Sequence, residues 1–128
     1  MGEERYIETE RLLLTPWEDT DECAEGLYSW AKDPRVGPNA GWAPHASVEE
    51  SRKIIREMFI PGGDGYAIRD KATREIIGNI SVYEDTAREG VASMELGYAL
   101  KYECWGKGYV TEAGRALMAY AFEKYNWV

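Results

Sequence analysis

The sequence predicts an α+β (mixed α/β) domain in which helices flank a central, mostly antiparallel sheet. Three observations lead to this class: apolar residues recur at helical spacing in three segments, strand-like runs follow one another in the second half of the chain, and short polar turns join those runs as hairpins. The expected order is strand, helix, helix, three antiparallel strands and helix. The 128 residues suffice for one core, so residues 1–128 are expected to form a single domain.

The first strand and the first helix are expected before residue 34. Residues 11–17 (RLLLTPW) are largely apolar and contain a proline near their end, which is typical of a strand close to a sheet edge. Asp19 and Glu22 form a capping-box pattern, and apolar residues recur at helical spacing after it. This helix is expected to end at Asp33-Pro34, because the residue before a proline avoids the helical conformation.

A loop and a second helix follow. Residues 34–46 contain three prolines and two glycines, a composition typical of a loop. Ser47 and Glu50 form a second capping box, and an apolar stripe continues after it at helical spacing. Residues 61–63 (PGG) are expected to end this helix.

Three strands and a long helix are expected in the second half of the chain. Residues 65–70 and 75–84 should pair as a hairpin around a short polar turn, and residues 92–100 should form a third strand. Residues 109–125 carry an unbroken apolar stripe, which predicts a helix docked on the sheet. The alternation in the third strand predicts that one face is shared by Ala92, Met94, Leu96, Tyr98 and Leu100.

Charge and composition exclude several classes of function. The formal net charge of −8 argues against nucleic acid and membrane surfaces as partners, and it permits a cationic partner such as an amine, although solubility alone also explains it. No apolar run is long enough to span a membrane, and the N-terminus has no signal-peptide core. Cys23 and Cys104 are expected to be reduced thiols in the cytoplasm, and with His45 as the one histidine no metal site is expected.

A strand, a glycine turn and a helix N-terminus meet at residues 105–113 (WGKGYVTEA). This arrangement binds anions, often phosphates, because backbone N–H groups point out of the turn and the helix dipole adds partial positive charge. Lys107 adds a full charge. Two known phosphate motifs do not fit: Gly108 follows Lys107 where a P-loop has Ser or Thr, and Thr111 stands where the dinucleotide fingerprint needs its third glycine.

The same residues resemble the pyrophosphate loop of the GNAT N-acetyltransferases, which opens a helix directly after a strand. The pattern is Arg or Gln, any two residues, Gly, any one residue, and then Gly or Ala. Here it runs from Trp105, which replaces the Arg or Gln, to Val110, which replaces the usual small residue. Residues 8–14 (ETERLLL), 77–80 (IGNI) and 96–98 (LGY) are similar, in the same order, to the Rim-like branch that acetylates ribosomal-protein N-termini and small amines. The resemblance implies an N-acetyltransferase that transfers the acetyl group of acetyl-CoA to a primary amine, without a metal.

The resemblance also implies where the cofactor binds. Its pyrophosphate would contact the glycine loop, and its pantetheine would pair with the backbone of the preceding strand. Glu112 is expected to point away from the phosphates, which its charge would repel. Gly97 is either a bulge that splays this strand or a point of close packing. The implied cofactor-binding residues are Tyr98, Ala99, Leu100, Trp105, Gly106, Lys107, Gly108, Tyr109, Val110 and Thr111.

The implied reaction needs a neutral amine and a polarised thioester carbonyl. Glu95 is the candidate general base, because this branch often carries Glu in that strand; a polar residue on an uncovered sheet face, or a partner for an arginine, is the competing interpretation. Trp42 is the candidate substrate-binding residue, as an aromatic cover for a cationic amine, or else it holds its loop to the core. Cys104 is expected to be a small loop residue rather than a nucleophile, and His45 a loop residue in solvent.

The family pattern continues past the point where this sequence stops, with a strand, a helix and a final hairpin. That part supplies the other wall of the pantetheine slot and often a tyrosine acid, so the chain is expected to lack a C-terminal third and to leave residues 92–100 as an open edge. We therefore expect a homo-oligomer or a complementing C-terminal segment. Two other functions stay open, a non-catalytic acyl-CoA-binding or assembly module and an inactive fragment of such an enzyme.

Overall fold

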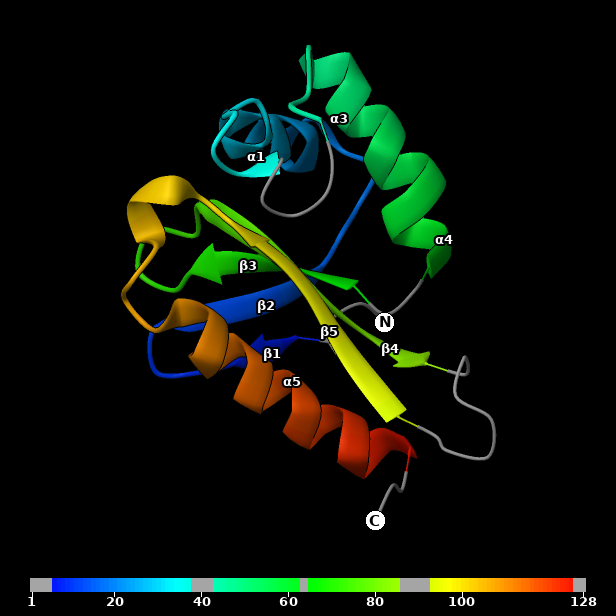
Figure 1. Cartoon of the computed structure of the whole chain (residues 1–128), viewed down its shortest axis with the longest axis vertical. Coiled ribbons are helices and arrows are strands. Elements are labelled where there is room, and N and C mark those ends of the chain that lie inside the picture. Colours follow the sequence, from blue (N-terminus) through cyan, green and yellow to red (C-terminus); the bar gives the residue numbers. More distant parts are fainter. Residues whose placement is uncertain (1–5, 38–42, 63–64, 86–92, 126–128) are drawn as a thin grey trace.

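An antiparallel sheet in the order β1-β2-β3-β4-β5 forms the centre of the computed structural model, which describes residues 6–37, 43–62, 65–85 and 93–125 (Figure 1). The predicted α+β class is confirmed. The strands are β1 (Ile7–Glu8), β2 (Leu12–Pro16), β3 (Gly65–Asp70), β4 (Ile76–Asp85) and β5 (Ser93–Leu100). The helices are α1 (Asp21–Ala31), α3 (Val48–Ile54), the π-helical η2 (Ile55–Phe59), α4 (Ile60–Gly62), the 3-10 turn η3 (Tyr102–Cys104) and α5 (Tyr109–Tyr125).

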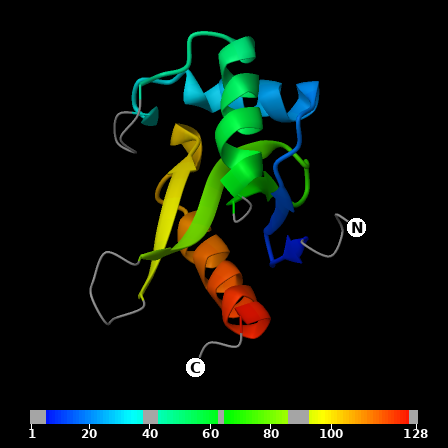
Figure 2. The ribbon, with the colours of Figure 1, turned by 90° about the vertical axis from the view of Figure 1, so that its right-hand side faces the viewer.

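Helices cover both faces of the sheet. Helix α5 lies on one face, and α1 and α3 lie on the other (Figure 1, Figure 2). Strand alternation places neighbouring residues in two separate clusters of buried side chains. Ile68 and Leu100 pack in the cluster that includes α5, while Ala67 and Ala99 pack in the cluster that includes α1.

The hairpin strands and the last helix follow the prediction closely. β3 and α5 have the predicted bounds, β4 begins and ends one residue later, and Ala92 lies outside the described residues. β1 was not predicted, because two residues are too short to show a period. It pairs with β2 through Ile7 opposite Leu14, and so adds a narrow edge to the sheet.

The start of α1 differs from the prediction. Thr20, not Asp19, caps the helix, since the Thr20 hydroxyl accepts from the backbone N–H of Cys23 at 3.2 Å. The Asp19 carboxylate instead accepts from the guanidinium groups of Arg52 and Arg56. The two arginines come from the second helical segment, and the ion pairs therefore connect it to the start of α1.

The second capping box is confirmed, but the helix after it is not uniform. The Ser47 hydroxyl accepts from the backbone N–H of Glu50 at 3.1 Å, and the Glu50 carboxylate accepts from the backbone N–H of Ala46. The α-helical turns give way to the π-helical segment η2, which the apolar stripe did not predict. Within the described residues, no helix has both the length and the apolar character needed to cross a membrane.

Candidate functional site

The segment between β5 and α5 forms a turn with two left-handed glycines. Gly106 has φ of 78° and Gly108 has φ of 79°, a region that glycine adopts without the steric penalty of a side chain. The backbone N–H of Glu112 donates to the Gly108 carbonyl at 3.0 Å and closes the first turn of α5. The N–H groups of residues 109–111 therefore lie at the helix N-terminus, where an α-helix has no internal acceptors for them.

A cavity of about 770 Å³ opens between this turn and the end of β5. It brings together nine of the ten residues predicted to bind the cofactor, all except Lys107. Val36 and Cys104 line it as well, although neither was predicted to. Val36 comes from the segment after α1 and is distant in sequence, so only the tertiary fold could reveal its place. The lining residues are Val36, Tyr98, Ala99, Leu100, Cys104, Trp105, Gly106, Gly108, Tyr109, Val110 and Thr111.

Tyr98 is exposed on a face of β5 where Leu100 is buried. Alternation places it on the same face as Leu100, but 55% of the Tyr98 surface is exposed, while Leu100 is buried at 5%. Tyr98 lines the cavity. The face that Tyr98 shares with Leu100 is therefore open at Tyr98.

The peptide groups of β5 alternate between β4 and the open edge of the sheet. The Lys101 N–H donates to the Ile77 carbonyl at 2.8 Å, and the register between β4 and β5 continues from there without a shift. Because every second residue of an antiparallel ladder bonds to the partner strand, Ala99 faces β4. The N–H groups of Tyr98 and Leu100 then point to the other side, where β5 is the last strand of the described sheet.

Gly97 does not form a bulge. It lies opposite Ser81 in an unbroken register, so that interpretation was wrong. The close approach between the two strands occurs at Gly78 instead. A Cβ added to Gly78 would lie 2.6 Å from the carbonyl oxygen of Ala99, closer than real Cβ atoms come to a backbone oxygen. The glycine of the 77–80 segment therefore lets β4 approach the part of β5 that lines the cavity.

Trp105 forms one wall of the cavity and is fixed from two sides. Its indole N–H donates to the carbonyl of Leu100 at 2.8 Å, which occupies an acceptor that faces the open edge of β5. Its ring lies 4.8 Å from the ring of Tyr102 between centroids, and the Arg35 guanidinium covers Tyr102 at 3.6 Å. The wall is thus held by contacts from η3 and from the segment that follows α1.

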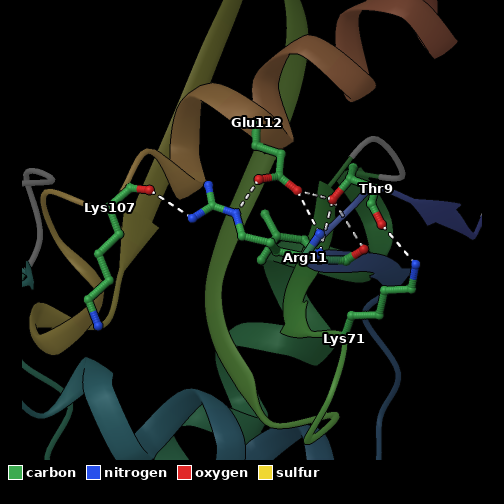
Figure 3. Close-up of polar contacts among 6 residues, drawn as sticks. Thr9, Arg11, Lys71, Lys107 and Glu112 are labelled. Atoms are coloured by element: carbon green, nitrogen blue, oxygen red, sulfur yellow. Dashed lines mark hydrogen bonds and ion pairs between the residues drawn. The ribbon is translucent and has the colours of Figure 1, made fainter.

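Arg11 and Glu112 form an ion pair next to the glycine turn (Figure 3). The Arg11 Nε donates to Glu112 Oε1 at 2.7 Å, and the Arg11 Nη1 donates to the Lys107 carbonyl at 3.0 Å. The second carboxylate oxygen of Glu112 accepts from the Thr9 hydroxyl and from the backbone N–H of Arg11. The Glu112 side chain is thus bound to the β1–β2 turn. Sequence reasoning quoted Arg11 within residues 8–14 but assigned it no role.

The charge on Glu112 is maintained by its partners. Partial burial raises the pKa of the Glu112 carboxyl, but the hydrogen bonds from Thr9 and Arg11 and the positive charge of Arg11 outweigh burial, so the pKa lies below its usual value. Lys107 contributes only its backbone to this group of contacts, and its side chain points away from it (Figure 3). Lys107 is exposed at the turn.

The remaining candidate residues are only partly placed. The backbone of Glu95 lies in β5 opposite Tyr83, but the structure does not describe the Glu95 side chain. Trp42, the candidate substrate-binding residue, lies outside the described residues. Cys104 is half-buried beside the cavity, and burial raises the pKa of its thiol, which disfavours a thiolate nucleophile. Among the described residues, no group of three or more acidic, histidine or cysteine side chains could hold a metal ion.

His45 is not a solvent-exposed loop residue as predicted. Its Nδ1 lies 2.7 Å from the Ser51 hydroxyl, and its backbone N–H donates to the Ala31 carbonyl. Burial lowers the pKa of His45, so the neutral ring is favoured. The residue thereby connects the segment before α3 to the end of α1, away from the cavity lining.

Comparison with known proteins gives one consistent family. The family model described as the acetyltransferase (GNAT) domain matches residues 11–128. The protein named uncharacterized N-acetyltransferase p20 from Bacillus licheniformis is 32% identical over 122 residues, which cover 92% of this chain and 66% of that protein. The chain therefore spans slightly less than two thirds of the length of this curated relative.

Solved structures agree on the fold. A GNAT acetyltransferase from Bacillus anthracis matches with a TM-score of 0.74 at 20% identity, over 94% of this chain and 68% of that one. An acetyltransferase from Agrobacterium tumefaciens matches with a TM-score of 0.67 at 26% identity, over 95% and 69%. A protein assigned as a ribosomal-protein-serine acetyltransferase from Vibrio cholerae matches with a TM-score of 0.72 at 25% identity, over 98% and 71%.

Proposed function

We propose that this chain, which belongs to the GNAT acetyltransferase family, uses acetyl-CoA to acetylate a primary amine. The observation that carries the proposal is a single cavity that joins an anion-binding turn to the open edge of a strand. At one end are the left-handed glycines and the first N–H groups of α5, which suit a pyrophosphate. At the other end are the outward peptide groups of Tyr98 and Leu100, which suit the amides of pantetheine.

The size and the lining of the cavity support this ligand. A volume of about 770 Å³ lies within the usual range of small-molecule sites, about 300–1,000 Å³. The lining includes the apolar residues Ala99, Leu100 and Val110, and the turn gives backbone donors. Because the indole of Trp105 already occupies the Leu100 carbonyl, the N–H of Leu100 and the carbonyl of Tyr98 are the groups that we assign to the amides of pantetheine.

The candidates for the group that polarises the thioester carbonyl are the backbone N–H groups of residues 97–99, and the register of β5 distinguishes among them. Among residues 97–99, Gly97 and Ala99 direct their N–H groups toward β4, so only Tyr98 offers an N–H on the open side. In the reaction, the neutral amine attacks the thioester carbon, the carbonyl oxygen gains negative charge, and the thiolate of CoA leaves. We assign the Tyr98 N–H to that oxygen.

Glu95 remains the proposed general base that removes a proton from the amine. It lies in the same strand, three residues before Tyr98. Glu95→Gln should lower kcat by about a hundredfold or more near neutral pH, the usual scale of general-base catalysis, while leaving the Kd of acetyl-CoA unchanged. Glu103→Gln is the matched control, since that exposed carboxylate does not line the cavity. Unchanged turnover in the Glu95 variant would rule out the base assignment.

The acceptor is proposed to be a peptide N-terminus or a small cationic amine. The net charge of −8 favours a cationic acceptor, and the Vibrio cholerae relative, named for a ribosomal-protein serine, points to a peptide of the Rim-like branch. Incubation with acetyl-CoA and a panel of Ser-initiated peptides, polyamines and aminoglycosides, read by mass spectrometry, tests this. Acetylation of only the lysine side chains of the peptides, or of no compound in the panel, would contradict the proposed acceptor.

The free thiols Cys23 and Cys104 fit a cytoplasmic location, which we propose for this chain.

A non-catalytic acyl-CoA-binding module or an inactive fragment is the alternative, and the open edge of β5 favours it. Edge strands pair readily with other chains, so we propose that a second copy or a complementing C-terminal segment covers this edge. Sedimentation at micromolar concentration should show an oligomer if a second copy does so. Binding of acetyl-CoA without turnover of any amine would support the module over the enzyme.

A further inference from the structure

The peptide between Lys107 and Gly108 has a defined orientation in the turn. The Lys107 carbonyl accepts from the Arg11 Nη1 at 3.0 Å (Figure 3). The peptide is trans and planar, so the N–H of Gly108 points opposite to that carbonyl. Gly108 separates two hollows: the cavity described above, and a second one that Arg11 and Glu112 line. With its carbonyl on the Arg11 side, this peptide directs the Gly108 N–H toward the cavity.

Nothing local to the turn requires this orientation. Glycine adopts positive and negative φ with similar ease, and Gly108 has φ of 79°, so the peptide before it can rotate at little steric cost. A rotated peptide would present the Lys107 carbonyl oxygen to the cavity in place of the Gly108 N–H. An acceptor would then stand where an anion needs a donor, so the orientation of one peptide decides whether the turn attracts or repels a phosphate.

Arg11 is held in place by groups other than Lys107. Its Nε donates to Glu112 Oε1 at 2.7 Å, and its guanidinium lies 4.5 Å from the centre of the Tyr109 ring. Glu112 is anchored in turn by the Thr9 hydroxyl and the backbone N–H of Arg11. A second contact holds the β1–β2 turn, because the Lys71 ammonium donates to the Thr9 carbonyl at 3.1 Å. The guanidinium therefore forms a fixed point between the β1–β2 turn and the start of α5.

These contacts separate two possible roles of Arg11. A cation that binds phosphate directly would be expected to turn toward the cavity, but Arg11 does not line it and is neutralised by Glu112. Two of its donors are used on Glu112 and on the Lys107 carbonyl. Its geometry fits a group that orients the backbone rather than one that contacts the ligand.

We propose that Arg11 is a positioning residue that holds the Lys107–Gly108 peptide with its N–H toward the cavity, and so makes the turn competent to bind the pyrophosphate of acetyl-CoA. The inference rests on the proposed function of the cavity. It assigns a role to the N-terminal strand pair that the glycine motif alone does not contain. It also explains how Glu112 can lie in the first turn of α5 without repelling the ligand.

The first experiment compares ligands with and without phosphate. Arg11→Met keeps the length of the side chain and removes its donors, and it should weaken the binding of CoA by about tenfold, the scale of one hydrogen bond from a charged donor at a partly exposed site. Binding of pantetheine, which has no phosphate, should stay unchanged. Arg56→Met is the matched control, because Arg56 also forms an exposed pair with a carboxylate, that of Asp19, but lies far from the turn in η2.

Arg11→Lys separates positioning from charge. A lysine keeps the positive charge but has no planar fork to bind Glu112 and the Lys107 carbonyl together, so its CoA affinity should stay close to that of Arg11→Met. Wild-type affinity in Arg11→Lys would show that charge alone matters and would overturn the proposal. Equal loss of CoA and pantetheine binding in Arg11→Met, with a lower melting temperature, would show a merely structural role and would also overturn it.

A second measurement does not depend on the ligand. In the free protein, the carbonyl ¹³C resonance of Lys107 reports whether that oxygen accepts a hydrogen bond, and it should move upfield in Arg11→Met but not in Arg56→Met. An unchanged resonance would refute the contact on which the inference stands. If the wild-type chain does not bind CoA but this resonance still moves, the proposed function fails while the peptide-orienting role of Arg11 is upheld.

Discussion

Replacing Gly106 with alanine tests whether the positive φ of the turn is needed for binding. A Cβ at this position would meet nothing within 4 Å, so the substitution adds no clash. Gly106 has φ of 78°, and the left-handed region costs a non-glycine residue roughly 1–2 kcal/mol. At 1.4 kcal/mol for each factor of ten, this corresponds to roughly a 5- to 30-fold change in an equilibrium constant.

The strain that Gly106→Ala introduces can appear in two measured quantities, the free energy of unfolding and the Kd of acetyl-CoA. If the turn keeps its shape without ligand, Gly106→Ala lowers the free energy of unfolding and leaves the Kd of acetyl-CoA unchanged. If the free turn relaxes, the unfolding free energy is kept and the Kd rises, because only the strained fraction binds. We expect the second case, since residues 105–108 are exposed. The two changes together should total about 1–2 kcal/mol.

Urea unfolding and calorimetric titration with acetyl-CoA measure both quantities on the same samples. A graded series sharpens the test: Asn tolerates positive φ better than Ala, and a β-branched Val tolerates it least, so the combined loss should rise in the order Asn, Ala, Val. Gly65→Ala is the control, because its Cβ would make only an ordinary contact at 3.7 Å and its φ is not positive. Wild-type stability and affinity in Gly106→Val would refute the reasoning.

Three further predictions concern the surroundings of the cavity. Gly78→Ala should destabilise the fold by about 1–3 kcal/mol in urea unfolding, because the new Cβ meets the Ala99 carbonyl and forces β4 and β5 apart; an unchanged midpoint would contradict the close approach. Burial raises the pKa of the Cys104 thiol, so its alkylation by iodoacetamide should become fast only above the usual thiol pKa of about 8.5, and acetyl-CoA should protect it. Rapid alkylation at neutral pH would contradict the raised pKa. Loss of turnover in Cys104→Ala would contradict the expectation that Cys104 is not a nucleophile. Lys107→Glu should weaken acetyl-CoA binding by about threefold to tenfold at low salt and by less at high salt, as expected for an exposed charge; a salt-independent effect would point to misfolding of the turn.

The elements with a clear period could be predicted from the sequence. The stripe of residues 109–125 and the runs at 65–70 and 75–84 gave bounds within one residue of α5, β3 and β4. β1 could not be predicted, because two residues show no period. The cap of α1 was assigned to Asp19 rather than Thr20 since both side chains can cap. Which of the two caps the helix depends on Arg52 and Arg56, which bind Asp19 and lie more than thirty residues away in sequence.

The candidate site was predictable where it is contiguous in sequence. Residues 98–100 and 105–111 lie close together in one segment, so the glycine motif and the family resemblance that it supports are enough to name them. The contribution of Val36 and the contact of Arg11 with Lys107 depend on segments that only the fold brings together. Burial also has no local signal at Tyr98, because alternation identifies a shared face but not whether a helix covers it.

The central claim is that the turn at Gly106–Gly108 and the edge of β5 form one site for acetyl-CoA. Calorimetric titration of the chain with acetyl-CoA, with pantetheine and inorganic pyrophosphate as partial ligands, tests it most directly. We predict saturable binding of one acetyl-CoA per chain, weaker binding of each partial ligand, and competition of both with acetyl-CoA. A folded chain that binds no acetyl-CoA, or binds it without competition from pyrophosphate, would contradict the account.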